Sequence, residues 1–255
     1  MIVFKYSSEV SSYSDKIKNC IQNFADSGND FIVGQRNSIK TFQLESQVLN
    51  IKSFKVPNLI NQIAYKYFRN SKAKRSFEYA TILLDKKIGT PKPIAFYENF
   101  NLIGLKESYY VCEHLVTELT FRELVTIPTF KDHENILRQF TKFSFEMHEK
   151  GVEFLDHSPG NTLIKDNGNS LYSFYLVDLN RMKFHDKMDL SCRMNNLSHL
   201  TPKKDMIEIM SDEYAKLSGE KFEVVFQMMW KETQDFQYRF YRKKKIKSII
   251  KFWKK

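Results

Sequence analysis

The residues of this sequence best suited to chemistry are two carboxylates and an amide in one short region. Asp156 precedes Asn161 by five residues in the segment FLDHSPGN, and Asp178 follows in YLVDLN. A carboxylate can orient a hydroxyl group and accept its proton, while an amide and a second carboxylate can hold Mg²⁺, which prefers oxygen ligands. Phosphoryl transfer needs such a set of groups. The three residues therefore predict a magnesium-dependent phosphoryl-transfer centre.

The elements expected around these residues favour this interpretation over an ordinary surface turn. Asp, Ser, Pro, Gly and Asn are all common in turns, so DHSPGN by itself fits both. Helical periodicity over 134–150 ends at Gly151, which suits a helix C-terminus. After the loop, Thr162–Ile164 and Tyr175–Asp178 predict two strands around the turn DNGN. A helix before the loop and a hairpin after it would bring the three oxygen ligands to one cleft.

The order of the other predicted elements gives an α+β chain. The expected elements are two or three strands over 30–55, a helical region over 58–87, and strands at 94–97 and 108–112. In the first of these regions Asn50 and Lys52 share one strand face, and Lys55 lies on the other. Helical patterns return near Phe121 and continue from about Met188. A β-rich first half and a mainly helical second half follow, joined near Glu113–Leu119.

Composition predicts a folded cytoplasmic protein. The 255 residues are 42% hydrophobic and 15% aromatic, which is enough to bury a core. The three cysteines, Cys20, Cys112 and Cys192, are scattered and lack a CxxC pair, which argues against both a disulfide framework and a zinc site. We expect neither a signal peptide at the N-terminus MIVFKYSSEV nor a membrane span, because no sufficiently long apolar run occurs.

Several segments together resemble the lipopolysaccharide core kinase family (Kdo/WaaP type) of the protein-kinase-like superfamily. They are NIKSFKVP, KAKRSFEYA, GTPKPIAFYE, MHEKGVEFLDHSPGNTLI and VDLNRMKF, and they extend over roughly 33–184. Their order and spacing make the resemblance to the superfamily specific, and the resemblance to the sugar kinases less so. The resemblance implies a bilobal protein-kinase-like fold, with ATP and Mg²⁺ as the phosphoryl donor and its metal ion.

The resemblance also assigns roles to individual residues. Asp156 is similar to the catalytic base, Asn161 to a Mg²⁺ ligand, and Asp178 to the metal-binding aspartate of a D-F-G motif, although here Leu and Asn follow it. Lys52, in N-I-K, resembles the lysine that holds the α- and β-phosphates, and Glu78, in R-S-F-E, its partner on a helix. A solvated strand lysine and an exposed helix charge are the alternatives for this pair.

Departures from the family pattern narrow the expected acceptor. Gly34 is the single glycine in the predicted phosphate loop, so backbone cradling of ATP is weaker here. Leu155 stands where protein kinases carry an arginine that couples to a phosphorylated loop, and no A-P-E segment follows Asp178. These features favour a sugar or other small acceptor over a protein. The adenine is expected against the backbone of the connector from Glu113 to Leu115.

The excess positive charge of the chain lies at its C-terminus. Residues 239–255 hold nine of the 40 basic residues and none of the 30 acidic ones, so the remainder is nearly neutral. Ile246, Ile249, Ile250 and Trp253 have helical spacing among these lysines. The pattern predicts either a helix that binds an anionic membrane or one that packs on the helical half. Nucleic-acid binding is not expected, because the body is neutral and lacks a reader motif.

The sequence thus predicts a single kinase-like domain over 1–255, with an N-lobe at 1–112, a C-lobe at 113–237 and a basic tail at 238–255. The expected reaction is ATP-dependent phosphorylation of a sugar hydroxyl, Kdo or heptose, of the lipid-linked lipopolysaccharide core. The expected location is cytoplasmic, at the inner face of the cytoplasmic membrane. Alternatives are a small-molecule kinase of the aminoglycoside or choline type, and a pseudokinase that acts as a binding module.

Overall fold

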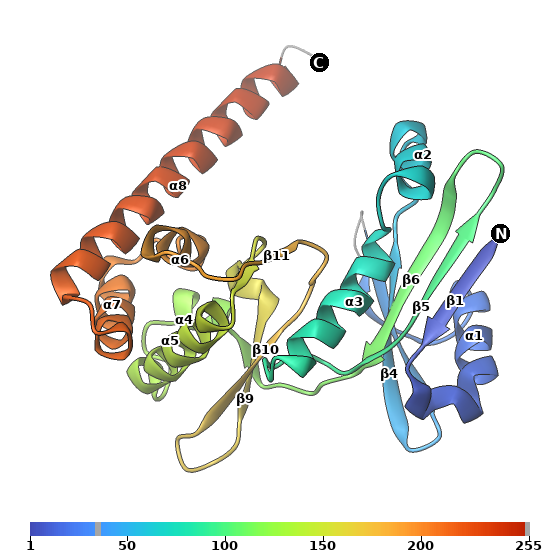
Figure 1. The fold of residues 1–255 in the computed structure, drawn as a ribbon, viewed down its shortest axis with the longest axis horizontal. Coiled ribbons are helices and arrows are strands. Elements are labelled where there is room, and N and C mark those ends of the chain that lie inside the picture. Colours follow the sequence, from blue (N-terminus) through green and yellow to red (C-terminus); the bar gives the residue numbers. More distant parts are fainter. Residues whose placement is uncertain (34–36, 253–255) are drawn as a thin grey trace. The chain divides into compact units, whose positions relative to one another are not determined.

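The computed structural model describes residues 1–33 and 37–252. The chain forms two units and contributes two separate segments to each of them. The first unit contains residues 1–116 and 176–181, and the second contains residues 117–175 and 182–255. A short segment around Asp178 therefore belongs to the first unit, although the sequence on either side of it belongs to the second. Figure 1 shows the elements of each unit.

A six-stranded antiparallel sheet with the order β1-β5-β6-β4-β3-β2 forms the centre of the first unit (Figure 1). Its strands are β1 (Ile2–Tyr6), β2 (Asn29–Val33), β3 (Asn37–Leu44), β4 (Gln47–Phe54), β5 (Pro93–Phe100) and β6 (Leu105–Glu113). The helices of this unit are the 3-10 helix η1 (Ser8–Tyr13), α1 (Ser14–Gln22), α2 (Leu59–Tyr67) and α3 (Lys72–Asp85). Successive side chains of a strand point to opposite faces of the sheet, so this alternation decides which side chains each helix covers.

The two faces of the sheet pack against different helices. On one face, Ile17 of α1 belongs to the same buried cluster as Ile51 and Val111. On the other, the ring of Phe96 in β5 lies 5.4 Å from that of Phe77 in α3. Residues directly opposite each other in a ladder share a face, so Phe96, its partner Tyr110, and Lys52 opposite Tyr110 all lie on the α3 face. Lys52 is thereby placed beside α3.

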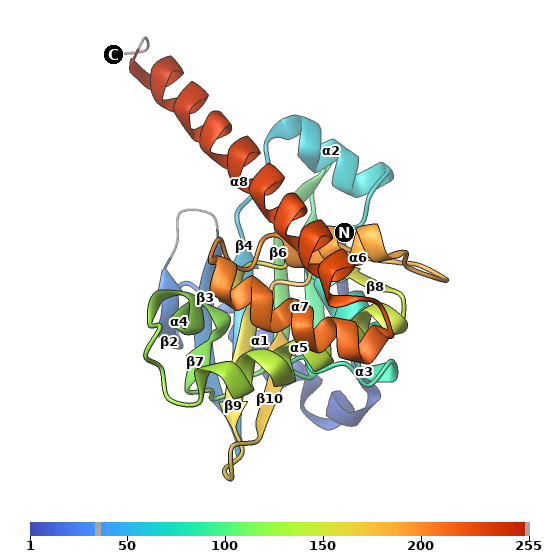
Figure 2. The ribbon, with the colours of Figure 1, turned by 90° about the vertical axis from the view of Figure 1, so that its left-hand side faces the viewer.

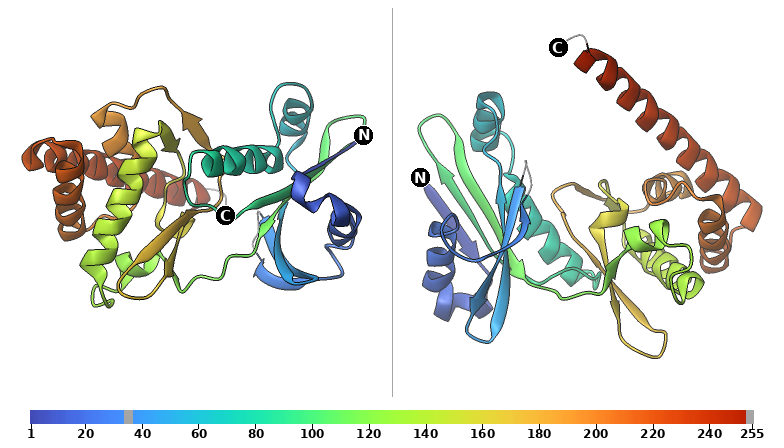
Figure 3. Two further views of the ribbon diagram at one scale, coloured as in Figure 1. Left: turned by 60° about the horizontal axis from the view of Figure 1, so that its bottom comes forward. Right: turned by 180° about the vertical axis from the view of Figure 1, so that it is seen from behind.

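The second unit is mainly helical, with short strands between the helices. Its elements are β7 (Leu119–Thr120), α4 (Phe121–Thr126), α5 (His133–Glu149), β8 (Val152–Phe154), η2 (Pro159–Asn161), β9 (Thr162–Asp166), β10 (Tyr172–Leu176), β11 (Met182–Phe184), α6 (Leu190–Leu197), α7 (Lys204–Ser218) and α8 (Phe222–Phe252). Helices α5 and α7 lie side by side, and α8 continues beyond α7 as a single helix (Figure 2). Strands β9 and β10 are neighbours in a hairpin (Figure 3).

Apolar side chains from α4, α5, α6, α7 and the start of α8 form the core of this unit. Phe140 of α5 is at its centre, fully buried, with the rings of Phe121, Phe174 and His157 within 6 Å. A capping box at Thr120 and Glu123 fixes the start of α4 beside this cluster. The core therefore lies directly under the loop that contains Asp156.

The structure confirms the α+β class and most of the predicted elements. The meander, the hairpin and the helix that ends before Gly151, which has φ 71°, are present. The region 58–87 is two helices, because Ser71 caps a new helix by accepting a hydrogen bond from the Lys74 amide. The sequence analysis missed β1, α1 and the β8–β11 pair. The predicted lobe boundaries at 112 and 237 stay a prediction.

Among the described residues 1–33 and 37–252, no helix is both long and apolar enough to cross a membrane.

Replacing Phe140 with alanine tests the assignment of the second core. The change removes a fully buried ring, so we expect the free energy of unfolding of the second unit to fall by about 3–5 kcal/mol. Phe240→Ala is the control, because that ring is 51% exposed on α8 and its loss should change stability by less than about 0.5 kcal/mol. Equal losses in urea unfolding would contradict this assignment.

Candidate active site

In the first unit, two of the predicted site residues, Lys52 and Asp178, form an ion pair that the sequence analysis did not predict. Lys52 Nζ donates a hydrogen bond to Asp178 Oδ1 at 2.7 Å, across 126 positions of sequence. The lysine side chain is 12% exposed and the aspartate 37%. A largely desolvated ammonium group needs a counter-charge, so the pair holds the segment 176–181 against the sheet. The charge of Lys52 also acts on Cys112, although burial dominates and raises the pKa of that thiol to about 12.

The backbone of Asp178 is held in an unusual conformation. Its φ of 61° lies in the left-handed region, which a residue with a Cβ adopts at a cost. Asn180 Nδ2 donates to the same Oδ1 at 2.7 Å. Before the aspartate, the Leu176 amide donates to the Gly89 carbonyl, and the Thr90 hydroxyl donates to the Leu176 carbonyl, each at 2.8 Å. These contacts fix the aspartate from both sides. The GTPKP turn after α3, which the sequence marked only as a helix breaker, supplies part of this anchor.

Glu78 does not pair with Lys52 in this structure, so the predicted partnership is not observed. Its carboxylate lies 3.9 Å from Lys74 Nζ, one helical turn earlier, and accepts a hydrogen bond from Asn70 Nδ2 at 3.1 Å. Lys52 already has Asp178 as its counter-charge. A second carboxylate beside α3, Glu98 of β5, is 5% exposed, and burial raises its pKa despite hydrogen bonds from Ser71. Glu98 had no sequence signal, since it lies just beyond the strand predicted at 94–97.

Two other parts of the chain were predicted to contact the nucleotide: the loop at Gly34 and the connector from Glu113 to Leu115. Gly34 lies outside the described residues. In the connector, the Glu113 amide donates to the Lys92 carbonyl at 3.0 Å and the His114 amide donates to the Val48 carbonyl at 2.9 Å. Glu113 is exposed and Leu115 half-buried. An adenine held by this segment would therefore use backbone groups other than those two amides.

The second unit contains Asp156 and Asn161 on one tight loop. The Asp156 carbonyl accepts hydrogen bonds from the Ser158 amide at 2.7 Å and from Asn161 Nδ2 at 2.8 Å. The amide nitrogen of Asn161 is thus committed to the loop, so its oxygen is the ligand atom that this side chain can offer. Both residues are half-buried. The predicted pair of a carboxylate and an amide is brought together by these hydrogen bonds.

A buried network of hydrogen bonds among His148, Asn196 and Tyr214 holds the strand that leads into this loop. His148 Nε2 lies 3.1 Å from Asn196 Oδ1, and its Nδ1 lies 3.0 Å from the Tyr214 hydroxyl. Because Asn196 Nδ2 donates to the Phe154 carbonyl at 2.8 Å, its oxygen must accept from the histidine. His148 therefore carries a proton on Nε2. The network ties α5, α6 and α7 to the strand that leads into Asp156.

His157, the residue after Asp156, anchors the loop in the core. Its ring is fully buried, with the rings of Phe154 and Phe140 at 5.5 and 5.7 Å. Burial lowers the pKa of His157 to about 3, and burial likewise lowers the pKa of His148 to about 4. Both histidines are thus neutral groups with a structural role.

Each unit by itself offers an oxygen donor of a kind that suits Mg²⁺. Asp178 Oδ1 accepts from Lys52 and Asn180, so its other carboxylate oxygen is the ligand atom that it can offer. Asn161 can offer an amide oxygen, and Mg²⁺ prefers oxygen ligands of these kinds. Lys52 supplies a positive charge for phosphate oxygens. The sequence analysis missed Asn180, although it follows Asp178 by only two residues.

Comparison with known proteins gives the fold. No protein-family model matches the sequence, and no curated protein matches it. Among solved structures, WaaP in complex with acyl carrier protein matches 93% of this chain and 97% of its own, with a TM-score of 0.63 and 11% identity. The chain therefore has a protein-kinase-like fold similar to that of WaaP. Hundreds of other solved chains also match, so the fold by itself does not select a substrate.

The buried histidines predict how stability depends on pH. Each folded-state pKa lies below the ordinary value of 6.5, so the unfolded chain binds protons that the folded chain does not. The stabilisation that comes from keeping each histidine neutral is therefore fully present above pH 6.5. It is lost as the pH falls, and for His148 this loss occurs between pH 6.5 and about 4. The slope is up to about 1.4 kcal/mol per pH unit per histidine.

Urea unfolding of the wild type and His148→Gln between pH 4.5 and 8 checks this expectation. Below pH 6.5, the free energy of unfolding of the variant should depend on pH less steeply, by about the contribution of one proton. Above pH 7, where the histidine and the glutamine are both neutral, the two proteins should show the same pH dependence. An unchanged slope at low pH would show that His148 is protonated in the folded chain.

Proposed function

We propose that this chain is an ATP-dependent kinase that phosphorylates a sugar hydroxyl, Kdo or heptose, of the lipid-linked lipopolysaccharide core. The observation that carries the proposal is the Lys52–Asp178 ion pair at 2.7 Å, formed by residues far apart in sequence. It accompanies the Asp156–Asn161 loop and a fold similar to that of a kinase. A lysine, an aspartate, an asparagine and a second aspartate in these elements match the groups that phosphoryl transfer requires.

In the proposed reaction each residue has a separate task. Asp156 orients the acceptor hydroxyl and accepts its proton as the new phosphate ester bond forms. Lys52 neutralises phosphate oxygens, and Asp178 and Asn161 offer oxygen ligands for the magnesium ion. The ion, when bound, stabilises the negative charge on the transferring phosphoryl group. The protein contributes mainly positioning and electrostatic stabilisation.

Clustered arginines in the first unit favour an anionic acceptor. Arg75 of α3 is half-buried, and its pKa is lowered by burial and then by the like charges of Arg69 and Arg181. Arg181 follows Asp178 by three residues. Like charges gathered near the proposed metal ligand would attract phosphate or carboxylate groups of a core sugar. They would repel the cationic acceptors choline and aminoglycosides, so these alternatives rank lower.

The basic end of α8 supports a membrane location for this reaction. In that region Tyr238, Phe240, Tyr241 and Ile246 have exposed fractions between 47% and 66%. Lysines and arginines, also exposed as far as residue 247, surround them. A cationic helix with exposed aromatic residues suits the interface of an anionic bilayer. We propose that this segment brings the enzyme to its lipid-linked acceptor at the cytoplasmic leaflet.

Transfer of labelled γ-phosphate from Mg·ATP to purified Kdo-bearing lipid A tests the proposed reaction. We expect transfer by the wild type and a loss of about 10²–10⁴-fold in Asp156→Asn, because the base is removed. Asp166→Asn is the matched control, since this exposed carboxylate lies in the β9–β10 hairpin and should leave transfer unchanged. Lys52→Met should also abolish most of the activity.

The other outcomes separate the rival functions. Nucleotide binding without transfer to the lipid, but with transfer to choline or an aminoglycoside, would favour the small-molecule kinases. Neither nucleotide binding nor transfer would favour the pseudokinase. Full activity in Asp156→Asn would show that Asp156 is not the catalytic base.

Truncation after Arg239 tests the membrane proposal. Eight of the nine basic residues of the tail are lost, and each contributes on the order of 1 kcal/mol near an anionic surface. Co-sedimentation with anionic vesicles should therefore fall strongly, while binding to neutral vesicles stays low for both forms. Residues 238–248 are exposed, so the truncated protein should keep its core. Unchanged co-sedimentation with anionic vesicles would discard the proposal.

A further inference from the structure

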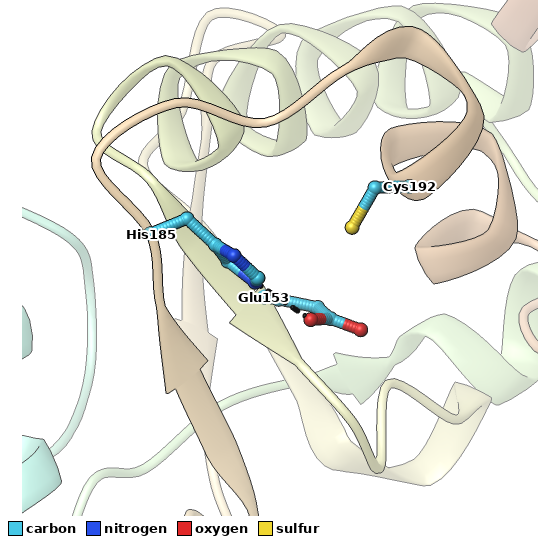
Figure 4. A group of neighbouring side chains, drawn as sticks. All are labelled: Glu153, His185 and Cys192. Carbon is cyan, nitrogen blue, oxygen red and sulfur yellow. Dashed lines mark hydrogen bonds and ion pairs between the residues drawn. The ribbon is translucent and has the colours of Figure 1, made fainter.

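Three potential metal ligands of different chemistry meet in the second unit. Glu153 lies in β8, His185 directly follows β11, and Cys192 is in the first turn of α6. One ligand atom from each residue lies within 4.8 Å of the other two. Figure 4 shows the side chains of His185 and Cys192 converging on the Glu153 carboxylate. The three residues come from separate elements, so their spacing in the sequence gives no metal-binding signature.

The backbone holds this cluster in place. The His185 amide donates to the Gly151 carbonyl at 2.8 Å, and a Cβ on Gly151 would collide with the His185 carbonyl. Gly151 also has a φ of 71°, so two constraints favour glycine there. At the start of α6, Asp189 Oδ1 accepts a hydrogen bond from the Cys192 amide at 2.7 Å. These contacts preorganise the elements that present the three side chains.

The charges of the cluster also suit a divalent cation. Glu153 is 9% exposed, and its Oε2 lies 2.7 Å from His185 Nε2 and 3.6 Å from Lys183 Nζ. A metal ion that binds here in place of the thiol proton of Cys192 would face one thiolate, one carboxylate and one neutral imidazole. These two negative charges would offset the charge of a divalent ion beside the Lys183 ammonium group.

We propose that Glu153, His185 and Cys192 form a binding site for a Zn²⁺-class transition-metal ion. Sulfur, nitrogen and oxygen ligands together suit zinc, whereas Mg²⁺ takes oxygen ligands. The three ligand atoms lie within 4.8 Å of one another, so side-chain shifts alone would bring them to tetrahedral zinc geometry. Water completes the fourth position. The site is independent of the proposed kinase reaction, and it revises the expectation that scattered cysteines exclude zinc.

The proposed ion would fasten three segments near the Asp156 loop. Strand β8, which carries Glu153, runs directly into that loop, and β11 pairs with β8 in a register that places Lys183 opposite Glu153. Helix α6 carries both Cys192 and Asn196, the residue that donates to the Phe154 carbonyl. Metal binding would therefore join β8, β11 and α6 by a second link beside this hydrogen bond.

Titration of the full-length, chelator-treated protein with Co²⁺ tests the site, because thiolate ligation gives a charge-transfer absorption band. We expect the band in the wild type and in Cys20→Ser, which alters another half-buried cysteine. Cys192→Ser should abolish the band, and His185→Gln should weaken the affinity by at least about tenfold. Absence of the band in the wild type, or its persistence in Cys192→Ser, would overturn the proposal.

A second measurement needs no variant, so it holds even where a substitution disturbs folding. Alkylation of the wild type by iodoacetamide is followed at Cys192 and Cys20 by peptide mass spectrometry. Zn²⁺ should slow modification of Cys192 at least about tenfold and leave Cys20 unchanged, while Mg²⁺ protects neither. Equal protection of both cysteines, protection by Mg²⁺, or no protection by Zn²⁺ would each contradict a zinc-class site.

Discussion

The first unit depends on satisfying one desolvated positive charge. Lys52 is placed by strand register on the face of the sheet beside α3, where 12% of its side chain is exposed. Asp178 supplies the counter-charge, and the left-handed backbone at that residue is the conformation that presents it. Removing one partner of a fully buried pair costs about 3–5 kcal/mol, and less here because 37% of Asp178 is exposed. The same two groups are those that a magnesium-bound nucleotide would need, so stability and the proposed function share one contact.

The second unit solves a different problem, which is to hold a polar loop on an apolar core. His157 turns inward between two aromatic rings, and the Asn196 amide ties the preceding strand to α6 through the Phe154 carbonyl. Both histidines stay neutral because burial disfavours their charged forms. Asp156 lies between these anchors. The rigidity of the loop therefore comes from its neighbours.

Two kinds of cation chemistry would then operate in this chain. The oxygen donors of Asp178 and Asn161 suit a hard ion that accompanies phosphate, whereas Glu153, His185 and Cys192 offer a mixed set for a softer ion. The ligand types keep the two ions from competing for one another's positions. The charged end of α8 would serve the proposed membrane contact, and its basic residues are exposed and lie apart from both donor sets in sequence. Location, reaction and the proposed metal link are thus assigned to separate residues.

The sequence by itself determined most of the element types and placed Asp156 and Asn161 together on the DHSPGN loop, because periodicity, turn residues and short spacing are local properties. It indicated Asp178 by its place after the predicted hairpin and Lys52 through resemblance, and the structure joins them by an ion pair. Tertiary structure alone decided that Lys52 pairs with Asp178 and not with Glu78, since a desolvated lysine is neutralised by whichever carboxylate the fold brings nearest. It also decided that β1 completes the sheet and that three scattered ligands meet. Those contacts join residues far apart in the chain, and their distances follow from packing rather than from sequence spacing.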